Sequence, residues 1–321
     1  MAAIRVIVLT NCTNRKRALP GELLMARSLP QGKIAPTSQL WVLRLQNAAS
    51  TYSAEELYCG RSLTETLTAA GQIGAEVAFI SAGLGVVRQR QLIPAYSLTT
   101  SMGYPDSVAS RINESFDPAA WWQALSISQG GSGRPLREFL EATQADLVLC
   151  AMPASYLALI NRELTELSPR FLKTTRVMGP RRRDDLPEAL RPYWLPYDAR
   201  LDCADTGYNG TAGDFPHRAL RHFTQEILPT VGLMAASDHS DSVERALEHF
   251  APYVRPRGQT ASDDEVILEI RTLWHLHQGR RAGILRALRS ERNVACEQTR
   301  FRQLMDKFEE NRRGAAQKKD T

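Results

Sequence analysis

The chain has 321 residues, of which 43% are hydrophobic, and no apolar run approaches the ~20 residues of a membrane span. This length exceeds one usual domain and predicts one large domain with a smaller one. The net charge of +5 is modest. Lys and Arg nevertheless gather in residues 1–44 and 271–302, as expected for a protein that binds a polyanion. Charge that serves only solubility is the alternative.

The amino-terminal segment lacks the long apolar region of a secretion signal, so we expect a cytoplasmic protein. The five cysteines are scattered without CxxC spacing: Cys12, Cys59, Cys150, Cys203 and Cys296. Reduced thiols are therefore expected, with no zinc or iron-sulfur cluster. The sequence contains no P-loop or dinucleotide-binding fingerprint that would indicate ATP or NAD, and we expect no cofactor and no metal.

Short apolar runs alternate with segments of helical periodicity over the first 256 residues. The predicted strands are residues 4–10, 77–81, 146–151 and 176–180, and the predicted helices are 40–51, 63–73, 135–143, 154–167 and 236–256, with a further helix opening near Pro216. Residues 18–39 contain three prolines and are expected to be irregular. This alternation predicts an α/β fold, a layered sheet with helices on both faces, over residues 1–256.

The segment Asn11-Cys12-Thr13-Asn14-Arg15-Lys16 follows the first predicted strand directly. At the carboxyl end of a strand, Asn11 and Asn14 can donate and accept hydrogen bonds, and Arg15 and Lys16 can reach phosphate. Such a loop suits a nucleotide. An Asx turn with solvated charges is the alternative.

The strand predicted over residues 77–81 ends in a loop that contains Ser81, Gly83 and Gly85, small residues that let a ligand approach the backbone. A turn with the aromatic Tyr96 follows. Because ligands of open α/β sheets bind at the carboxyl ends of strands, we expect the rim of an active site here. A glycine-rich turn without function is the alternative.

The run SAGLGVVRQRQLIPAYSLT, residues 81–99, resembles YaaA-type proteins, in which a strand ends in a Ser-Gly-Leu-Tyr-Gly-Val-like loop and a Pro-Tyr-Arg-Leu-like turn follows. Related bacterial domains carry an upstream Leu-Tyr-x-Gly segment that resembles Leu57-Tyr58-Cys59-Gly60. The chain departs from YaaA at residues 11–16, where Ser-Pro-Ala-Lys is expected. By overall look it also resembles antiphage DNA glycosylases that remove glucosylated cytosine from phage DNA, with layers of the uracil-DNA-glycosylase type.

Residues 195–223 form a second dense stretch, with three glycines, Tyr208 and four aspartates: Asp198, Asp202, Asp205 and Asp214. Carboxylates on a Gly-rich loop can ligate magnesium, cap a helix or act as acid and base. Arg181, Arg182 and Arg183 follow another predicted strand, where they can contact phosphate. The pair Trp121-Trp122 is interpreted as a core plug or lid, with base stacking as the alternative.

Residues 257–313 predict a small helical module, with helices over 263–276, 282–289 and 297–311. A bend near Asn293 resembles a helix-turn-helix, whose arginines would face DNA. The arginines predicted to bind DNA are Arg281, Arg286, Arg289 and Arg300. A helical docking module is the alternative, and residues 314–321 are expected to be a disordered tail.

These features and the resemblance together suggest a DNA glycosylase that excises a modified base from phage DNA. The candidate catalytic residues are Asn11, Asp198, Asp205 and Asp214. The candidates for binding an extruded base are Asn14, Tyr58, Ser81, Gly83, Gly85, Tyr96 and Tyr208. The alternatives are a non-catalytic DNA-binding stress-response protein of the YaaA kind and a nucleoside or nucleotide hydrolase.

Overall fold

A computed structural model describes residues 4–253 and 258–317, with side chains through Arg312 in the last helix. The chain divides into two compact units, Met1–Tyr253 and Val254–Thr321. No helix within the described residues combines the length and the hydrophobicity that crossing a membrane requires.

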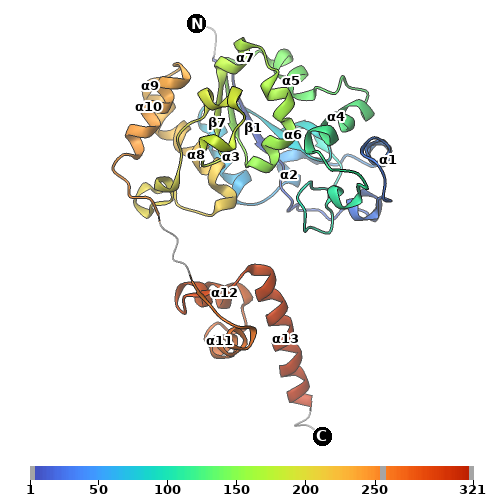
Figure 1. The fold of residues 1–321 in the computed structure, drawn as a ribbon, viewed down its shortest axis with the longest axis vertical. Helices are drawn as coiled ribbons and strands as arrows, with labels where there is room; N and C mark the ends of the chain where they lie inside the picture. The colour runs from blue at the N-terminus through green and yellow to red at the C-terminus, as the bar shows by residue number, and fades with distance from the viewer. Residues whose placement is uncertain (1–3, 254–257, 318–321) are drawn as a thin grey trace. The chain divides into compact units, whose positions relative to one another are not determined.

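A five-stranded sheet in the order β4-β3-β1-β6-β7 forms the centre of the first unit (Figure 1). Its strands are β1 (Val6–Asn11), β3 (Glu76–Ser81), β4 (Gly85–Arg88), β6 (Leu147–Ala151) and β7 (Thr175–Met178). Only β4 is antiparallel to its neighbour. The chain adds β3 on one side of β1 and β6 on the other, so the winding reverses between β1 and β6. Ligands of open α/β sheets bind beyond the carboxyl ends at such a switch point.

Helices cover both faces of this sheet (Figure 1). One group comprises α3 (Arg61–Gln72), α8 (Phe215–His222), α9 (Leu228–Val231) and α10 (Ala236–Leu247); the other comprises α1 (Ile34–Gln46), α4 (Pro118–Ser128), α5 (Pro135–Thr143) and α6 (Ala154–Thr165). The short α2 (Ala54–Leu57), α7 (Pro169–Thr174) and the pair β2 (Tyr52–Ser53) and β5 (Leu92–Ile93) lie in the connections. The predicted α/β class is confirmed.

Two helix boundaries differ from the sequence prediction. Helix α1 begins at Ile34, inside the segment expected to be irregular, because Pro36 lies in its first turn, where no intrahelical N–H bond is lost. Helix α10 ends at Leu247, well before residue 256, and Pro252 follows it, where proline cannot continue a helix.

Buried tryptophans fix the loop that follows β3. The indole N–H of Trp121 donates to the Ala82 carbonyl at 2.8 Å, and that of Trp41 donates to the Gly83 carbonyl at 2.8 Å. Trp122 donates to the carboxylate of Glu163. All three rings are at most 2% exposed. The interpretation of Trp121 and Trp122 as a core plug is therefore confirmed, and neither is a base-stacking platform.

Three helices and a two-stranded parallel pair form the second unit: α11 (Asp263–Leu276), α12 (Arg281–Ser290), α13 (Gln298–Gln317), β8 (Gln259–Thr260) and β9 (Val294–Ala295). Leu273, Ile284 and Met305 are among the side chains of its core. Helix α13 continues through residues 314–317, where Ala315 and Ala316 favour helix, and residues 318–321 of the expected tail lie outside the described residues.

Candidate functional site

Asn11 and His217 meet at the carboxyl edge of the sheet. Asn11 is the last residue of the central strand β1, and His217 lies in the first turn of α8. The Nε2 atom of His217 is 3.0 Å from Oδ1 of Asn11. His217 is 1% exposed, whereas Asn11 is partly exposed. Asn11 is therefore the member of the pair that a substrate or water can reach.

The orientation of the Asn11 amide follows from its second contact. Its Nδ2 donates to the Cys12 carbonyl at 2.9 Å, so Oδ1 faces His217 and accepts the proton of Nε2. Burial lowers the pKa of His217 to about 4, against the opposing influence of Asp214, so the ring is neutral at pH 7. The neutral imidazole thus locks an amide whose remaining lone pair and N–H can hold a water molecule.

Cys12 and Tyr156 span the point where the winding of the sheet reverses. Cys12 follows β1, and Tyr156 lies in the first turn of α6 after β6. The Cys12 sulfur is 3.2 Å from the Tyr156 hydroxyl. Burial raises the pKa of Tyr156, so its hydroxyl stays protonated. The switch point between β1 and β6 is therefore lined by polar groups beside Asn11, where the topology predicts a ligand.

A chain of hydroxyl groups connects β3 to the turns beside it. Ser81 Oγ accepts the backbone N–H of Gly83 at 3.2 Å and is 2.6 Å from the Tyr96 hydroxyl, which is 2.9 Å from that of Tyr58. Burial raises the pKa of both tyrosines. Gly83 is required here because a Cβ at this position would lie 2.8 Å from the Tyr96 ring. These residues stabilise the rim, and Tyr96 offers no free face for a base on the Gly83 side.

The side chain of Lys16 lies at this rim, with its amine over two aromatic rings. Its Nζ lies 4.2 Å from the centroid of the Tyr96 ring and 5.8 Å from that of Tyr58, and it donates to the Thr13 carbonyl at 3.1 Å. Burial lowers the pKa of Lys16 below its usual value. Asn14 and Arg15 of the same loop are exposed. Lys16 is thus a largely desolvated amine that packs against two tyrosine rings.

Arg218 engages two of the candidate aspartates. This arginine is 0% exposed; its Nε donates to Asp214 at 2.7 Å and one terminal nitrogen donates to Asp202 at 2.8 Å. Asp214 also accepts the Thr211 N–H and contacts Arg61. Such a fully paired carboxylate is a poor acid or base, so the geometry assigns Asp214 a structural role.

Four further candidate residues have surroundings of their own: Asp198, Asp205, Tyr208 and Gly85. Asp198 caps the short helix Ala199–Asp202 and pairs with Arg200, whereas Asp205 is exposed. Tyr208 is 8% exposed, and its hydroxyl donates to Glu226 at 2.8 Å. Gly85, the first residue of β4, takes a φ of +80°. Within residues 4–253, none of these four forms a side-chain hydrogen bond or ion pair with Asn11 or His217.

Basic side chains flank the carboxyl edge. Arg181, which follows β7, lies 4.0 Å above the Phe215 ring and pairs with Asp202 at 2.7 Å. Arg182 and Arg183 are exposed, and within residues 4–253 neither they nor Arg15 forms an ion pair. These three arginines therefore remain available for phosphate.

The arginines of the second unit are mostly bound within it. Arg281 pairs with Asp306 and Glu309, Arg300 pairs with Asp263 at 2.6 Å, and Arg289 donates to the Cys296 carbonyl. Arg286 is exposed and forms no ion pair with the residues described in this unit. A four-residue turn that includes Gly279 joins α11 to α12, whereas seven residues separate α12 from α13. The helix-turn-helix spacing thus falls before α12 rather than near Asn293.

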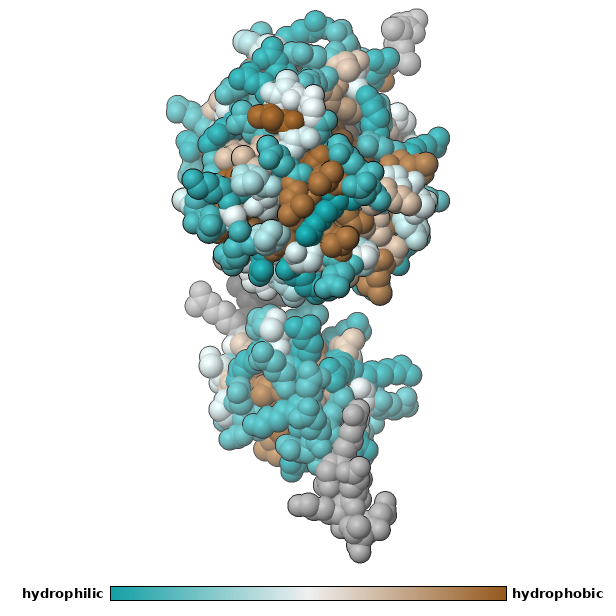
Figure 2. Space-filling model, turned by 90° about the vertical axis from the view of Figure 1, so that its right-hand side faces the viewer, coloured by the Kyte–Doolittle hydropathy of each residue, from teal (hydrophilic) through white to brown (hydrophobic). Residues whose placement is uncertain are grey.

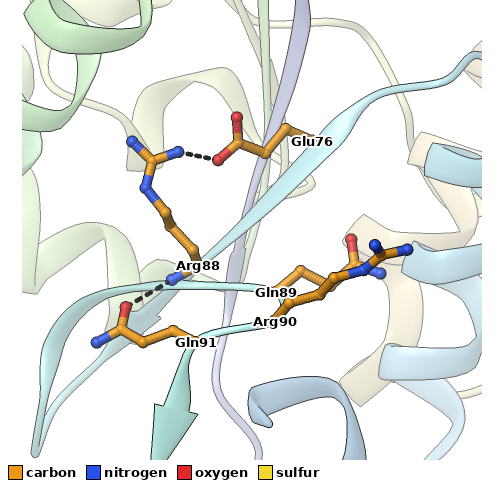
Figure 3. A pocket seen from close by; sticks show the side chains of 5 residues that line it. All are labelled: Glu76, Arg88, Gln89, Arg90 and Gln91. Atoms are coloured by element: carbon orange, nitrogen blue, oxygen red, sulfur yellow. Dashed lines mark hydrogen bonds and ion pairs between the residues drawn. The ribbon is translucent and has the colours of Figure 1, made fainter.

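Two surface depressions of the first unit lie away from this edge. The larger, of about 630 Å³, is lined by Glu76, Arg88, Gln89, Arg90 and Gln91, at the amino end of β3 (Figure 3). Its Arg88 is already paired with Glu76. The other, of about 470 Å³, contains Leu23, Leu24 and Leu43 of an apolar surface, and Figure 2 shows apolar side chains gathered on one face. Neither depression combines groups for catalysis.

Within the described residues, no three His, Cys, Asp or Glu side chains gather so that they could hold a metal ion. Comparisons with family models, with curated proteins and with solved structures find no match, so the functional argument rests on the geometry. Sequence reasoning selected Asn11 but missed His217 and Arg218. The i, i+4 spacing of Asp214 and Arg218 was a usable signal for an ion pair.

Proposed function

We propose that the protein is a DNA glycosylase that hydrolyses the bond between deoxyribose and a modified base, with glucosylated hydroxymethylcytosine of phage DNA as the substrate. The observation that carries the proposal is the Asn11–His217 pair at the carboxyl end of the central strand. The proposed relationship to α/β layers of the uracil-DNA-glycosylase type comes from the sequence resemblance alone.

The chemistry of base removal suits this pair. When the bond to the base lengthens, the sugar becomes an oxocarbenium-like cation, which is a strong electrophile. An attacking water then needs orientation more than deprotonation, and the free lone pair of a locked Asn11 amide supplies it. Partial negative charge on the amide oxygen also favours the developing cation. Asn11 is therefore preferred over Asp214, whose oxygens are bound to arginines.

Exposed cations support DNA as the polymer that carries the base. Arg15 lies in the loop that follows the central strand β1, and Arg182 and Arg183 lie in the segment that follows β7. Arginines that follow two strands of the same sheet edge can grip the phosphates that flank an extruded nucleotide.

A hydrolase of free nucleosides or nucleotides is the second candidate. It is favoured by the internal pairing of Arg281 and Arg300, which leaves fewer cations of the second unit for a DNA duplex. Deletion of residues 258–321 discriminates the two: a small-molecule hydrolase keeps its activity, whereas a DNA enzyme loses affinity for DNA.

The test uses purified full-length protein and two phage DNAs, one with glucosylated hydroxymethylcytosine and one unmodified. Released base is measured by chromatography and abasic sites by an aldehyde-reactive probe. Release from the modified DNA alone supports the proposal. Absence of release from both DNAs refutes it, and release from both refutes the substrate assignment.

A further inference from the structure

Lys16 occupies a position that phosphate binding does not require. A lysine that binds phosphate extends its ammonium group into solvent as a point charge. Lys16 instead places Nζ over the Tyr96 ring and has no carboxylate partner in residues 4–253. Its Nζ donates a hydrogen bond to the carbonyl of Thr13. The side chain is therefore held at the rim of the site by two ring faces and a carbonyl rather than by an ion pair.

The loop that carries Lys16 is tied down on both sides. The Cys12 N–H donates to the Ile80 carbonyl at 3.0 Å and the Arg17 N–H donates to the Leu57 carbonyl at 2.9 Å. Lys16 itself forms a backbone bridge with Tyr58. Since the loop begins at Asn11 and is anchored to β3, the amine is fixed on the same edge as the Asn11–His217 pair.

We propose that Lys16 is a nucleophile that attacks C1′ of the abasic deoxyribose and cleaves the DNA strand by β-elimination. The inference rests on the proposed glycosylase function, because base removal creates the aldehyde that an amine attacks. Desolvation lowers the pKa of Lys16 by more than the nearby Cys12, Cys59 and Asp106 raise it, which favours the neutral amine, the reactive form of lysine.

The step balances with water as the only other reactant. Nζ adds to C1′ of the open-chain aldehyde, and loss of water gives a protonated imine. The imine makes the C2′ hydrogens acidic; one proton passes to solvent water while the C3′–O bond breaks and the 3′ phosphate leaves. A C2′=C3′ double bond remains. Hydrolysis of the imine returns the Lys16 amine and releases the unsaturated aldehyde at the 5′ fragment.

The experiment uses full-length protein and a duplex with one abasic site prepared beforehand, so that it does not depend on base removal by this protein. Sodium borohydride reduces the imine to a stable amine and links the protein to DNA. We expect a covalent adduct on denaturing gels, mapped by mass spectrometry to Lys16, and strand breakage without alkali. Mapping on the wild-type protein needs no variant to fold.

Two variants test whether Lys16 is the nucleophile. Lys16→Arg keeps a long basic side chain but removes the nucleophile, and we expect its adduct to fall at least tenfold. Lys33→Ala, an exposed lysine at the start of α1, should form the adduct normally. Circular dichroism checks that Lys16→Arg is folded.

The outcomes separate this inference from the proposed function. No adduct with bound abasic DNA, or an adduct at another amine, overturns the role of Lys16. Base release with strand breakage only after alkali also overturns it and leaves the glycosylase proposal intact. An adduct at Lys16 without base release from any DNA supports the amine chemistry and refutes the glycosylase.

Discussion

The imidazole Nε2 of His217 lies 3.0 Å from the amide oxygen of Asn11, although 206 residues separate them in the chain. Because the Asn11 amide nitrogen is bound to the Cys12 carbonyl, this contact fixes the orientation of the amide. In the proposed function, the buried histidine positions the partly exposed asparagine, and the asparagine contacts the substrate.

Replacement of Asn11 tests this assignment. Asn11→Ala removes the oxygen that orients water, and we expect single-turnover base release to fall on the order of 10²- to 10³-fold, as for loss of one preorganised polar group. Affinity for DNA should change little. Asn47→Ala, an exposed asparagine after α1, is the matched control. Equal rates for Asn11→Ala and the wild type would remove Asn11 from the chemistry.

The buried histidines predict how stability depends on pH. The pKa of His217 is about 4 in the folded protein and ~6.5 when unfolded, so the unfolded state alone binds a proton between these values. Folding stability should therefore fall as pH decreases through this window, and His217 should account for about 2 kcal/mol of the loss between pH 7.5 and 5. Burial lowers the pKa of His222 to about 4 as well.

Urea unfolding at pH 7.5 and pH 5 checks this expectation. His217→Gln should lose less stability between the two pH values than the wild type, whatever its stability at pH 7.5. His249→Gln, an exposed histidine of the same unit, is the control. An unchanged pH dependence in His217→Gln would show that the ring is not held neutral.

Local patterns in the sequence predict the fold well, because the spacing of hydrophobic residues and the capping residues identify strands and helices. Residues 77–81, 135–143 and 263–276 follow the predicted elements closely. The sheet order and the switch point depend on pairing between distant segments, and no local pattern encodes it.

The candidate site could be predicted only in part. Asn11 was accessible from the sequence because it follows a strand, but its partner in α8 is brought close only by folding. The aspartates of residues 198–214 looked catalytic because the amino-acid composition does not show which of them are paired with arginines. Asp214 and Asp202 share Arg218, and that pairing exists only in three dimensions.

Arg218 should be essential for stability. Arg218→Met leaves the buried Asp214 and the partly buried Asp202 without this cation, and we expect a loss of about 3–5 kcal/mol. Arg182→Met, at an exposed position, should stay within about 0.5 kcal/mol of the wild type. Denaturant unfolding measures both. Adding Asp214→Asn to Arg218→Met should recover part of the loss; no recovery would argue against the charge as the cause.

Gly83 should not tolerate a methyl group. In Gly83→Ala the new Cβ would lie 2.8 Å from the Tyr96 ring, which is fixed by Ser81, so we expect a destabilisation of about 1–3 kcal/mol. Gly21→Ala is the matched control, because nothing lies within 4 Å of its Cβ. The melting temperatures of the two variants give the comparison, and similar values would mean that the ring moves freely.

The arginines of the second unit should differ in their contribution to DNA binding. Arg286 of α12 is exposed and forms no ion pair within this unit's described residues, whereas Arg300 is paired with Asp263. If the unit contacts phosphate, Arg286→Ala should lower affinity for all sequences alike and reduce the slope of log K against log salt by about 0.9. Arg300→Ala should change that slope less and destabilise α11 against α13 instead. Fluorescence anisotropy over a salt series measures the slopes. If Arg286→Ala leaves the slope unchanged, α12 does not face DNA, and the second unit acts as a docking module.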